Sequence, residues 1–329
     1  MNRSVSFLQS DRLPQEPGQA IRRQANRLGF LLCAVLATMY LFAFGLQLYL
    51  LLTGYRGTAQ TAETNAILTY LLNGTVSICG MVLPIVVFAA IATLRPCDLL
   101  PARPVKFLTG TACFFVCGAV CLLANVPSSM MILLLQRLGL QGNLSEMPVA
   151  ISTPAIILNV LATAIVPPIT EELLFRGLIL GKLRQYGDVF AIISSALLFA
   201  FLHRNAAQIL FAFICGLALG FALVKTNNIW VPISIHMFVN GFYVTMGILR
   251  TQFSDVGYAI LMYAVLGMAI LLALIFLIYL LLRKEKLPAF QQGALTTGKS
   301  MGNLFANPGI IIFTAACLIL TVARLGGWL

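Results

Sequence analysis

The sequence predicts an all-α integral membrane protein, a polytopic bundle of about eight or nine transmembrane helices. First, hydrophobic residues make up 60% of the 329 residues, well above the roughly 45–50% apolar content of soluble domains. Second, only 9% of the residues are charged, and the mean hydropathy is +0.95. Third, long apolar runs recur along the chain, and a run of about 18 or more residues can cross a bilayer.

Nine apolar runs are predicted to span the membrane. The first contains about 25 residues, whereas the apolar core of a signal peptide has roughly 7–15, so we expect an uncleaved span. The fourth is long for one helix and contains Pro167-Pro168, which predicts a kink or break there. The fifth is short. The predicted spans are residues 28–52, 66–93, 107–126, 149–180, 189–205, 206–224, 230–249, 257–282 and 308–323.

The net charge of +11 is distributed as expected for membrane topology rather than for nucleic-acid binding. With a cytoplasmic N-terminus, 15 of the 21 Lys and Arg residues fall in predicted inner segments and five in outer segments, while Arg176 lies within a span. This asymmetry follows the positive-inside rule. We therefore expect an integral protein of the plasma membrane with a cytoplasmic N-terminus, an anionic inner leaflet as its lipid partner and no nucleic-acid partner.

Two adjacent acids, Glu171 and Glu172, lie in the fourth predicted span, followed by Arg176. An ionisable side chain at the bilayer centre costs about 2.5–3.5 kcal/mol on insertion scales, so its presence indicates function. Glu172 and Arg176 share a helix face, where they can neutralise each other. Glu171 is rotated by about 100° and has no local partner, and such a carboxylate takes up a proton more readily, as a general base near neutral pH must. The alternative is a buried ion pair with a spare acid at a helix end.

The two histidines of the chain also lie in apolar stretches, each with a partner one helical turn away. His203 shares a helix face with Phe199, and Arg204 follows at once, which places this histidine near the end of a span. His236 shares a face with Asn240, and two neutral donors aimed at one point in a dry site stabilise an oxyanion. Taken singly, each pair also fits polar contacts between helices. Together with the acids, they predict a catalytic site inside the membrane.

These three motifs, in this order on successive membrane helices, resemble those of the CPBP family. The family comprises the type II CAAX prenyl proteases and the bacteriocin-processing or Abi proteins, which are intramembrane endopeptidases. The sequence Leu173-Leu174-Phe175-Arg176-Gly177 around the acids and Trp230-x-Pro232 before the second histidine also match. The resemblance covers roughly residues 150–245, under a third of the chain, and the ordered set is more specific than any one motif.

The resemblance implies an endopeptidase that hydrolyses a peptide bond in a membrane-associated substrate, either of the lipidated CaaX type or bearing a leader peptide. It implies catalysis by an activated water and an oxyanion hole. The residues implied are Glu171 and His203 for water activation, His236 and Asn240 for the oxyanion, and Glu172 and Arg176 for ordering the site.

Several alternatives remain open. Zinc held by Glu171, His203 and His236 is one, but we favour a site without a cofactor because Asn240 suits an oxyanion hole better than a zinc site. A second is a non-catalytic membrane scaffold or a bacteriocin-immunity-type protein, a role that some members of the family hold. A third is a proton-coupled transporter, since intramembrane acids and histidines also serve proton relays. The sequence shows no internal repeat of the kind that transporters contain.

The chain divides by composition into four predicted regions. Only the third contains the three motifs, and no segment is predicted to form a separate soluble domain. The regions are a cytoplasmic polar tail at 1–27, N-terminal membrane helices at 28–148, a catalytic membrane core at 149–249 and C-terminal membrane helices at 250–329.

Overall fold

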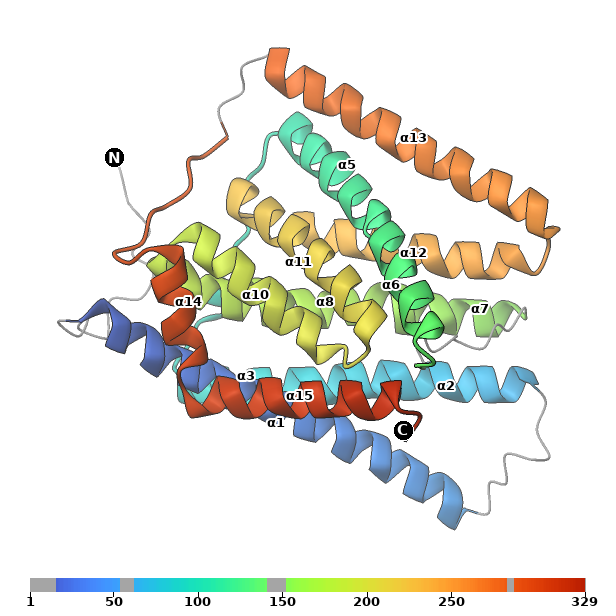
Figure 1. Cartoon of the computed structure of the whole chain (residues 1–329), viewed down its shortest axis with the longest axis horizontal. Coiled ribbons are helices and arrows are strands. Elements are labelled where there is room, and N and C mark those ends of the chain that lie inside the picture. Colours follow the sequence, from blue (N-terminus) through green and yellow to red (C-terminus); the bar gives the residue numbers. More distant parts are fainter. Residues whose placement is uncertain (1–15, 54–61, 141–151, 283–286, 329) are drawn as a thin grey trace.

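A computed structural model describes residues 16–53, 62–140, 152–282 and 287–328 of the chain. In these residues the secondary structure is helical, apart from one isolated antiparallel bridge between Ala102 and Asn228. Figure 1 shows the helices packed as one bundle. Eight helical segments in the described part of the chain are long and apolar enough to cross a membrane, so the predicted fold class is confirmed.

The eight candidate spans include three that are interrupted by other helical turns. A ninth apolar helix, α10 (Asp188–Leu202), is shorter, as predicted for the fifth span. Short helices α4 (Pro96–Leu99) and α14 (Thr297–Phe305) lie between spans. The spans are α1 (Pro17–Leu52), α2 and α3 (Ala62–Ser77 and Leu83–Ile91), α5 and α6 (Phe107–Leu123 and Asn125–Arg137), α7 to α9 (Thr153–Asn159, Val166–Glu172 and Gly181–Leu183), α11 (Ala206–Thr226), α12 (Trp230–Arg250), α13 (Asp255–Leu282) and α15 (Pro308–Leu325).

The first helix begins earlier than the first predicted span. Pro17 occupies the first turn of α1, a position where the missing N–H of proline costs nothing, and residues 17–27 of the predicted polar tail are helical. The rest of the predicted tail, residues 1–15, lies outside the described residues. Helix α6 continues α5 and extends the third span to Arg137, while residues 141–148, at the end of the predicted N-terminal membrane region, also lie outside the described residues.

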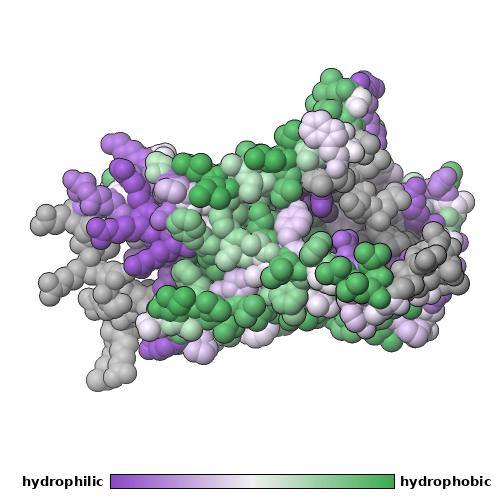
Figure 2. Space-filling view, turned by 90° about the horizontal axis from the view of Figure 1, so that it is seen from below, coloured by the Kyte–Doolittle hydropathy of each residue, from purple (hydrophilic) through white to green (hydrophobic). Residues whose placement is uncertain are grey.

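The surface is apolar over the middle of the molecule. Figure 2 shows hydrophobic side chains covering the central part of one face, with hydrophilic side chains gathered toward its ends. Helix α13 contains no buried residue and is the most apolar of the eight candidate spans in the described residues. In water such a surface would drive aggregation, whereas lipid chains solvate it, as expected for a bundle that spans a bilayer.

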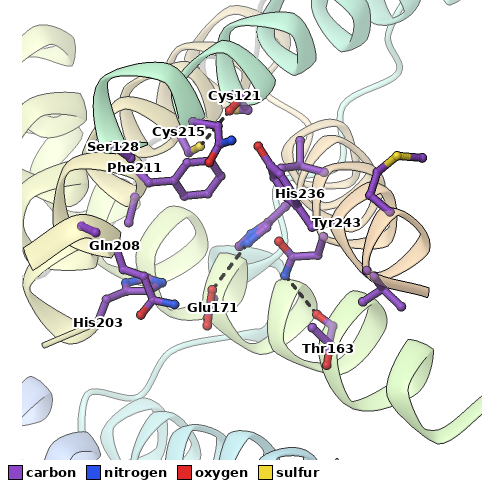
Figure 3. Close-up of a pocket in the computed structure, with 18 of the residues that line it drawn as sticks. Cys121, Ser128, Thr163, Glu171, His203, Gln208, Phe211, Cys215, His236 and Tyr243 are labelled. Atoms are coloured by element: carbon purple, nitrogen blue, oxygen red, sulfur yellow. Dashed lines mark hydrogen bonds and ion pairs between the residues drawn. The ribbon is translucent and has the colours of Figure 1, made fainter. Parts of the chain in front are cut away.

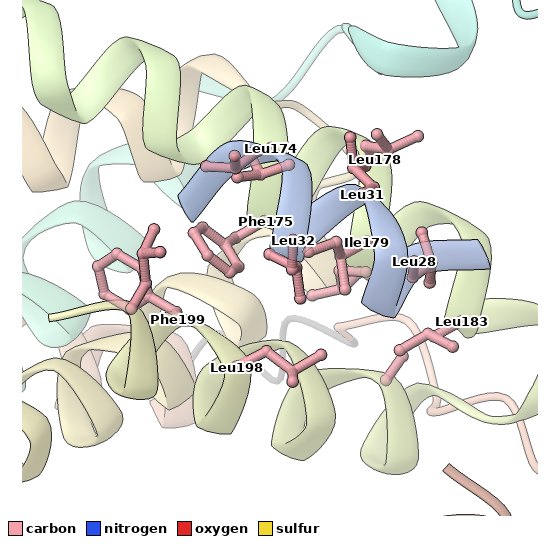
Figure 4. Close-up of a cluster of buried hydrophobic side chains, with 14 of the residues drawn as sticks. Leu28, Leu31, Leu32, Leu174, Phe175, Leu178, Ile179, Leu183, Leu198 and Phe199 are labelled. Atoms are coloured by element: carbon pink, nitrogen blue, oxygen red, sulfur yellow. The ribbon is translucent and has the colours of Figure 1, made fainter. Parts of the chain in front are cut away.

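The buried core lies between α1, α10 and the helix that carries the acids. Figure 4 shows Leu28 and Leu32 of α1 near Ile179, with Phe175 and Phe199 beside them. All five are at most 2% exposed. Because lipid is as apolar as these side chains, close van der Waals packing holds such helices together more than the hydrophobic effect does.

Two helix crossings depend on glycine. A Cβ atom added at Gly216 of α11 would lie 2.9 Å from the Cα of Ala196 in α10, so only glycine allows this approach. Gly309 of α15 crosses α1 in the same way, because an added Cβ would lie 2.5 Å from the carbonyl oxygen of Asn26. Gly216 therefore allows the close helix packing that small residues provide in membrane proteins.

The helix with the acids is not broken at Pro167 and Pro168. It runs from Thr153 to Tyr186, and two π-helical segments, Val160–Ile165 and Leu173–Leu180, flank the prolines and the acids. A π-helical turn accepts a residue that cannot continue the regular hydrogen-bond ladder, and such turns are frequent at functional sites. The helix is therefore continuous rather than broken, and its helical register changes on both sides of α8.

Candidate active site

Four of the six predicted site residues line one cavity of about 640 Å³. Glu171 reaches it from α8, His203 from the end of α10, and His236 and Asn240 from α12. Figure 3 shows Glu171 and His236 pointing toward each other, with His203 nearby on the same side of the cavity. The fold thus brings together side chains that the sequence places in three separate helices.

The other two predicted residues, Glu172 and Arg176, lie behind the cavity wall and are fully buried. Nη1 of Arg176 lies 3.0 Å from Oε1 of Glu172, although its N–H is not aimed closely enough to count as a hydrogen bond. The guanidinium also donates from Nη2 to the carbonyl oxygen of Gly216 at 3.4 Å and stands 4.6 Å from the centre of the Phe199 ring. These contacts compensate a buried charge that would otherwise be strongly destabilising.

His236 connects the two acids. Its Nδ1 lies 2.9 Å from Oε1 of Glu172, and its Nε2 lies 3.6 Å from Oε2 of Glu171. The first distance is a hydrogen bond, whereas the second is within ion-pair range but too long for a hydrogen bond. Glu172, which is paired with Arg176, therefore orients the imidazole, and Glu171 faces the other ring nitrogen.

The contact with Glu172 fixes the tautomer of His236. An ionised carboxylate can only accept, so Nδ1 carries a hydrogen. In the neutral ring Nε2 then holds a lone pair, and it becomes a donor only when the ring takes a second proton. We expected two neutral donors at His236 and Asn240, but this geometry requires an imidazolium for donation from His236.

His203 is oriented by its own helix. Its Nδ1 lies 3.0 Å from the carbonyl oxygen of Phe199, which can only accept, so Nε2 holds the lone pair in the neutral ring. The ring of Phe199 meets both imidazoles edge-on, with centroid distances of 4.8 Å to His203 and 5.9 Å to His236. Phe199 therefore packs against both imidazoles and limits their rotation.

Asn240 is anchored by a backbone group that Pro167 and Pro168 leave without a partner in the helix. Its Nδ2 donates to the carbonyl oxygen of Thr163 at 3.0 Å. That carbonyl would accept from residue 167 in an α-helix or from residue 168 in a π-helix, and neither proline has an N–H. The N–H of Val166 is already bonded to Leu161. One hydrogen of the Asn240 amide is thus committed, and the second is left for the cavity.

The opposite wall of the cavity combines aromatic and cysteine side chains with the polar Ser128. Figure 3 places Phe211, Cys215 and Cys121 on the side away from Glu171 and Thr163. The thiol of Cys215 donates to the carbonyl oxygen of Cys121 at 3.8 Å, between α11 and α5. A cavity lined by apolar side chains together with a few convergent polar groups is typical of a ligand site.

The donor set does not fit a zinc site well. Both imidazoles bind an oxygen through Nδ1, as metal-bound histidines commonly do. Nevertheless, within the described residues no three His, Cys, Asp or Glu side chains converge closely enough to hold one ion. Asn240 points to the same cavity, and an amide is not among the usual zinc ligands.

Sequence reasoning did not find Thr163 and Gly216, because both act through their backbone carbonyl groups. The Pro167-Pro168 pair was the available signal for Thr163, since it removes two N–H groups from one helix. Asn159 is also linked to this region, because it accepts a hydrogen bond of 3.0 Å from the hydroxyl of Thr163. No sequence feature pointed to Gly216 as a partner of the arginine.

Comparison with known proteins identifies the region that contains the site. Residues 153–242, which include all six predicted site residues, match the family described as Type II CAAX prenyl endopeptidase Rce1-like. The chain is 34% identical over 93 residues to YdiL of Bacillus subtilis (strain 168), which is named as a membrane peptidase, covering 28% of this chain and 38% of YdiL. It is 34% identical over 96 residues to the membrane-embedded CAAX protease MroQ of Staphylococcus aureus (strain USA300), covering 27% of this chain and 39% of MroQ.

These matches confirm the resemblance indicated by the three motifs, and they span less than two-fifths of the length of either curated relative. No solved structure matches the chain.

Proposed function

Because residues 153–242 match the type II CAAX prenyl endopeptidase family, we propose that the protein is an endopeptidase whose active site lies within the membrane. The observation that carries the proposal is the convergence of Glu171, His203, His236 and Asn240 on one cavity. The proposed substrate is a membrane-associated peptide or protein, either lipidated at a CaaX-type end or bearing a leader peptide.

The reactive state is defined by one proton shared between Glu171 and His236. If the proton is on Glu171, this residue cannot act as a base, and Nε2 of His236 has no hydrogen to donate. If it is on His236, Glu171 is a carboxylate and Nε2 is a donor. With the pair of Glu172 and Arg176, both states have a net charge of zero, which a low-dielectric site favours. Moving this proton to His236 therefore creates the base and the oxyanion donor together.

Hydrolysis then proceeds by general base catalysis. The Glu171 carboxylate takes a proton from a water that His203 orients through Nε2, and the water oxygen bonds to the carbonyl carbon of the substrate. The carbonyl oxygen becomes an oxyanion held by Nε2–H of His236 and Nδ2–H of Asn240. The C–N bond breaks as Glu171 returns its proton to the leaving nitrogen. The products are a carboxyl group and an amine, and Glu171 is again a carboxylate.

Glu172 and Arg176 act as positioning residues in this scheme. Glu172 holds the tautomer and orientation of His236 and stabilises the imidazolium, in the way the aspartate of a serine-protease triad acts on its histidine. Arg176 provides the counter-charge of the Glu172 carboxylate and holds it in place. Neither needs to touch the substrate.

We propose that no metal takes part, because the candidate donors do not converge on one point and Asn240 serves the oxyanion instead. Metal analysis of active protein tests this, together with activity after chelation. Full activity in a zinc-free preparation is expected. Loss of activity on chelation that zinc restores would contradict the proposal.

The proposed orientation places the N-terminus in the cytoplasm and the protein in the plasma membrane. It rests on the excess of Lys and Arg residues in alternate connecting segments, and the basic side would contact anionic lipid. Labelling of single cysteines introduced at Arg103 and Arg137, which fall on opposite sides in this topology, is expected to differ in intact cells. Equal access to a membrane-impermeant reagent would contradict it.

Cleavage of peptides by purified protein tests the proposed function. Prenylated CaaX peptides and leader-peptide junctions are incubated with the wild type and with Glu171→Gln, and products are identified by mass spectrometry. Loss of the general base is expected to lower the rate by about 10²–10⁴-fold. Glu63→Gln is the matched control, since Glu63 lies in the first turn of α2 and does not line the cavity. Equal cleavage by the wild type and Glu171→Gln would remove Glu171 from the mechanism.

A further inference from the structure

Two arginines lie close together near the ends of α10 and α15. Arg204 directly follows His203 in the turn between α10 and α11, and Arg324 lies in the last turn of α15. Their guanidinium groups are close enough to repel each other electrostatically, and neither side chain lines the cavity that contains Glu171. Both belong to the five basic residues that the proposed topology places outside. Two like charges therefore meet on the side of the membrane that has few of them.

The Arg204 guanidinium has no counter-charge within the described residues. Its Nε is buried and has no hydrogen-bond partner there. The ion pairs of the described residues, formed at N–O distances of up to 4.0 Å, include neither Arg204 nor Arg324. Cζ of Arg204 stands 5.3 Å from the centre of the Tyr40 ring of α1, a contact that leaves the positive charge in place. A cation removed from water requires an anion close by, so we expect the anion to come from another molecule.

The backbone at Arg204 is strained. Its φ is +52°, in the left-handed region where residues other than glycine and asparagine are uncommon. Its N–H donates to the carbonyl oxygen of Phe201 at 3.1 Å, which closes the end of α10. A glycine would end the helix in this way without strain. The arginine at this position therefore indicates that its side chain contributes something that glycine does not, as is common where strain is retained.

Each arginine has an ordinary explanation when it is taken alone. A cation at the end of a helix complements the partial negative charge of the helix C-terminus, and at a membrane surface a long side chain extends its head to water. Arg137 fits this explanation, because it lies in the last turn of α6 and is exposed. The same explanation does not account for two neighbouring guanidinium groups, one of them with a buried Nε that lacks a partner. Arg137 therefore provides a matched control.

The surroundings of the arginine pair favour a lipid over a free ion. Figure 1 shows α15 lying along α1, and both helices present exposed apolar side chains near the pair, including Phe44 one turn beyond Tyr40. Trp328, four residues after Arg324, is also exposed. Tyrosine and tryptophan are enriched where acyl chains meet headgroups, and a guanidinium matches a phosphate through parallel hydrogen bonds. This place thus offers cations for a phosphate and an apolar surface for acyl chains.

We propose that Arg204 and Arg324 bind the phosphate group of one membrane phospholipid, whose acyl chains lie along the exposed apolar side chains of α1 and α15. The phosphate accepts hydrogen bonds from the guanidinium groups and removes their mutual repulsion. An anionic phospholipid is preferred to a zwitterionic one, because the pair carries two positive charges. The lipid binds outside the cavity, beside the turn that carries His203. This inference does not depend on the proposed peptidase function.

Counting bound lipids by native mass spectrometry tests the proposal. Purified wild type, Arg204→Gln, Arg324→Gln and Arg137→Gln are titrated in detergent with dioleoyl phosphatidylglycerol. The wild type and Arg137→Gln are expected to bind one molecule tightly. Arg204→Gln and Arg324→Gln are each expected to bind it about 10- to 100-fold more weakly, because each loses charge-assisted hydrogen bonds. Unchanged binding in either of these two variants would overturn a site made by both arginines.

Three further probes identify the group that is recognised. Dioleoylglycerol has the same acyl chains without a phosphate, and dioleoyl phosphatidylcholine has a phosphate next to a cation. The first is expected not to displace phosphatidylglycerol, and the second to displace it only weakly. Inorganic phosphate is expected not to displace it. Displacement by dioleoylglycerol would mean that the groove recognises acyl chains alone, displacement by inorganic phosphate would mean a site for a free ion, and either result would contradict the proposal.

Thermal unfolding provides a readout that does not require transfer to the gas phase. Phosphatidylglycerol is expected to raise the unfolding temperature of the wild type and of Arg137→Gln by more than that of Arg324→Gln, because a ligand stabilises the state that binds it. Arg324 lies at a helix end, so this variant keeps the test valid if Arg204→Gln fails to fold. Equal shifts in the three proteins would contradict the proposal. Since no peptide is cleaved in either experiment, their outcome is independent of the test with Glu171→Gln.

Discussion

His236 contacts both acids, and this single residue joins the buried ion pair to the cavity. Its Nδ1 is 2.9 Å from Glu172, whereas Nε2 faces Glu171 at 3.6 Å. The helix geometry of the motif predicted the pairing of Glu172 with Arg176, which lie 3.0 Å apart, because residues four apart share a face. It gave no sign of His236 between them, since that contact joins residues of two different helices. The roles of the individual residues stay predictions.

Replacing Glu172 with Gln is expected to lower both stability and activity. The change leaves the buried guanidinium of Arg176 without a counter-charge, which costs about 3–5 kcal/mol. It also removes the carboxylate that holds His236 in one tautomer. The corresponding change in a serine-protease triad lowers kcat by about 10⁴-fold. Thermal unfolding in detergent and peptide cleavage measure the two effects.

A double variant separates these two effects. Glu172→Gln combined with Arg176→Met removes both charges, so most of the stability is expected to return while the activity stays low. Recovery of activity along with stability would mean that Glu172 serves the fold alone.

At the scale of the helix, the change of register around α8 could not be predicted from the sequence. Pro167-Pro168 predicted a kink or break in the helix. The length of the apolar stretch around the two prolines fits either a bent or a straight helix. In the structure, Asn240 of α12 supplies the hydrogen bond that the Thr163 carbonyl lacks within its own helix. Such a contact depends on how two helices are placed, and the sequence pattern of either helix does not contain it.

Restoring an N–H next to Thr163 is expected to weaken the anchoring of Asn240. In Pro168→Ala the backbone of residue 168 can donate to the Thr163 carbonyl in the π-helical register, so the amide of Asn240 loses its unique acceptor. We expect a smaller loss of kcat than the roughly 10²–10³-fold that removing an oxyanion donor with Asn240→Ala causes. Cleavage kinetics of both variants provide the measurement. A Pro168→Ala enzyme as slow as Asn240→Ala would contradict a role confined to anchoring.

At the scale of the whole molecule, the sequence predicted the fold class and nearly all of the spans. Apolar length decides whether a segment can cross a bilayer, so this signal is local and strong. The packing of α15 against α1 near the two ends of the described chain (Figure 1) was not predicted, because it depends on Gly309 and Asn26, which are far apart in sequence. Gly309 donates from its backbone to the Asn26 side chain at 2.9 Å.

Enlarging Gly309 is expected to destabilise the molecule without changing the chemistry. In Gly309→Ala the added Cβ meets the Asn26 carbonyl oxygen at 2.5 Å, and overpacking of this kind costs about 1–3 kcal/mol. Neither α1 nor α15 lines the cavity, so kcat measured below the unfolding temperature is expected to equal that of the wild type. A large fall in kcat would show that this crossing controls the site.

The most direct measurement of the central claim is a double-mutant cycle at Glu171 and His236, using one defined peptide and single-turnover rates. If the two residues share a proton and act as a unit, losses from Glu171→Gln and His236→Gln do not add, as is common within a catalytic unit. The double variant is then expected to be about as slow as the slower single variant. Losses that multiply would mean that the two side chains act independently, and the shared-proton mechanism would be wrong.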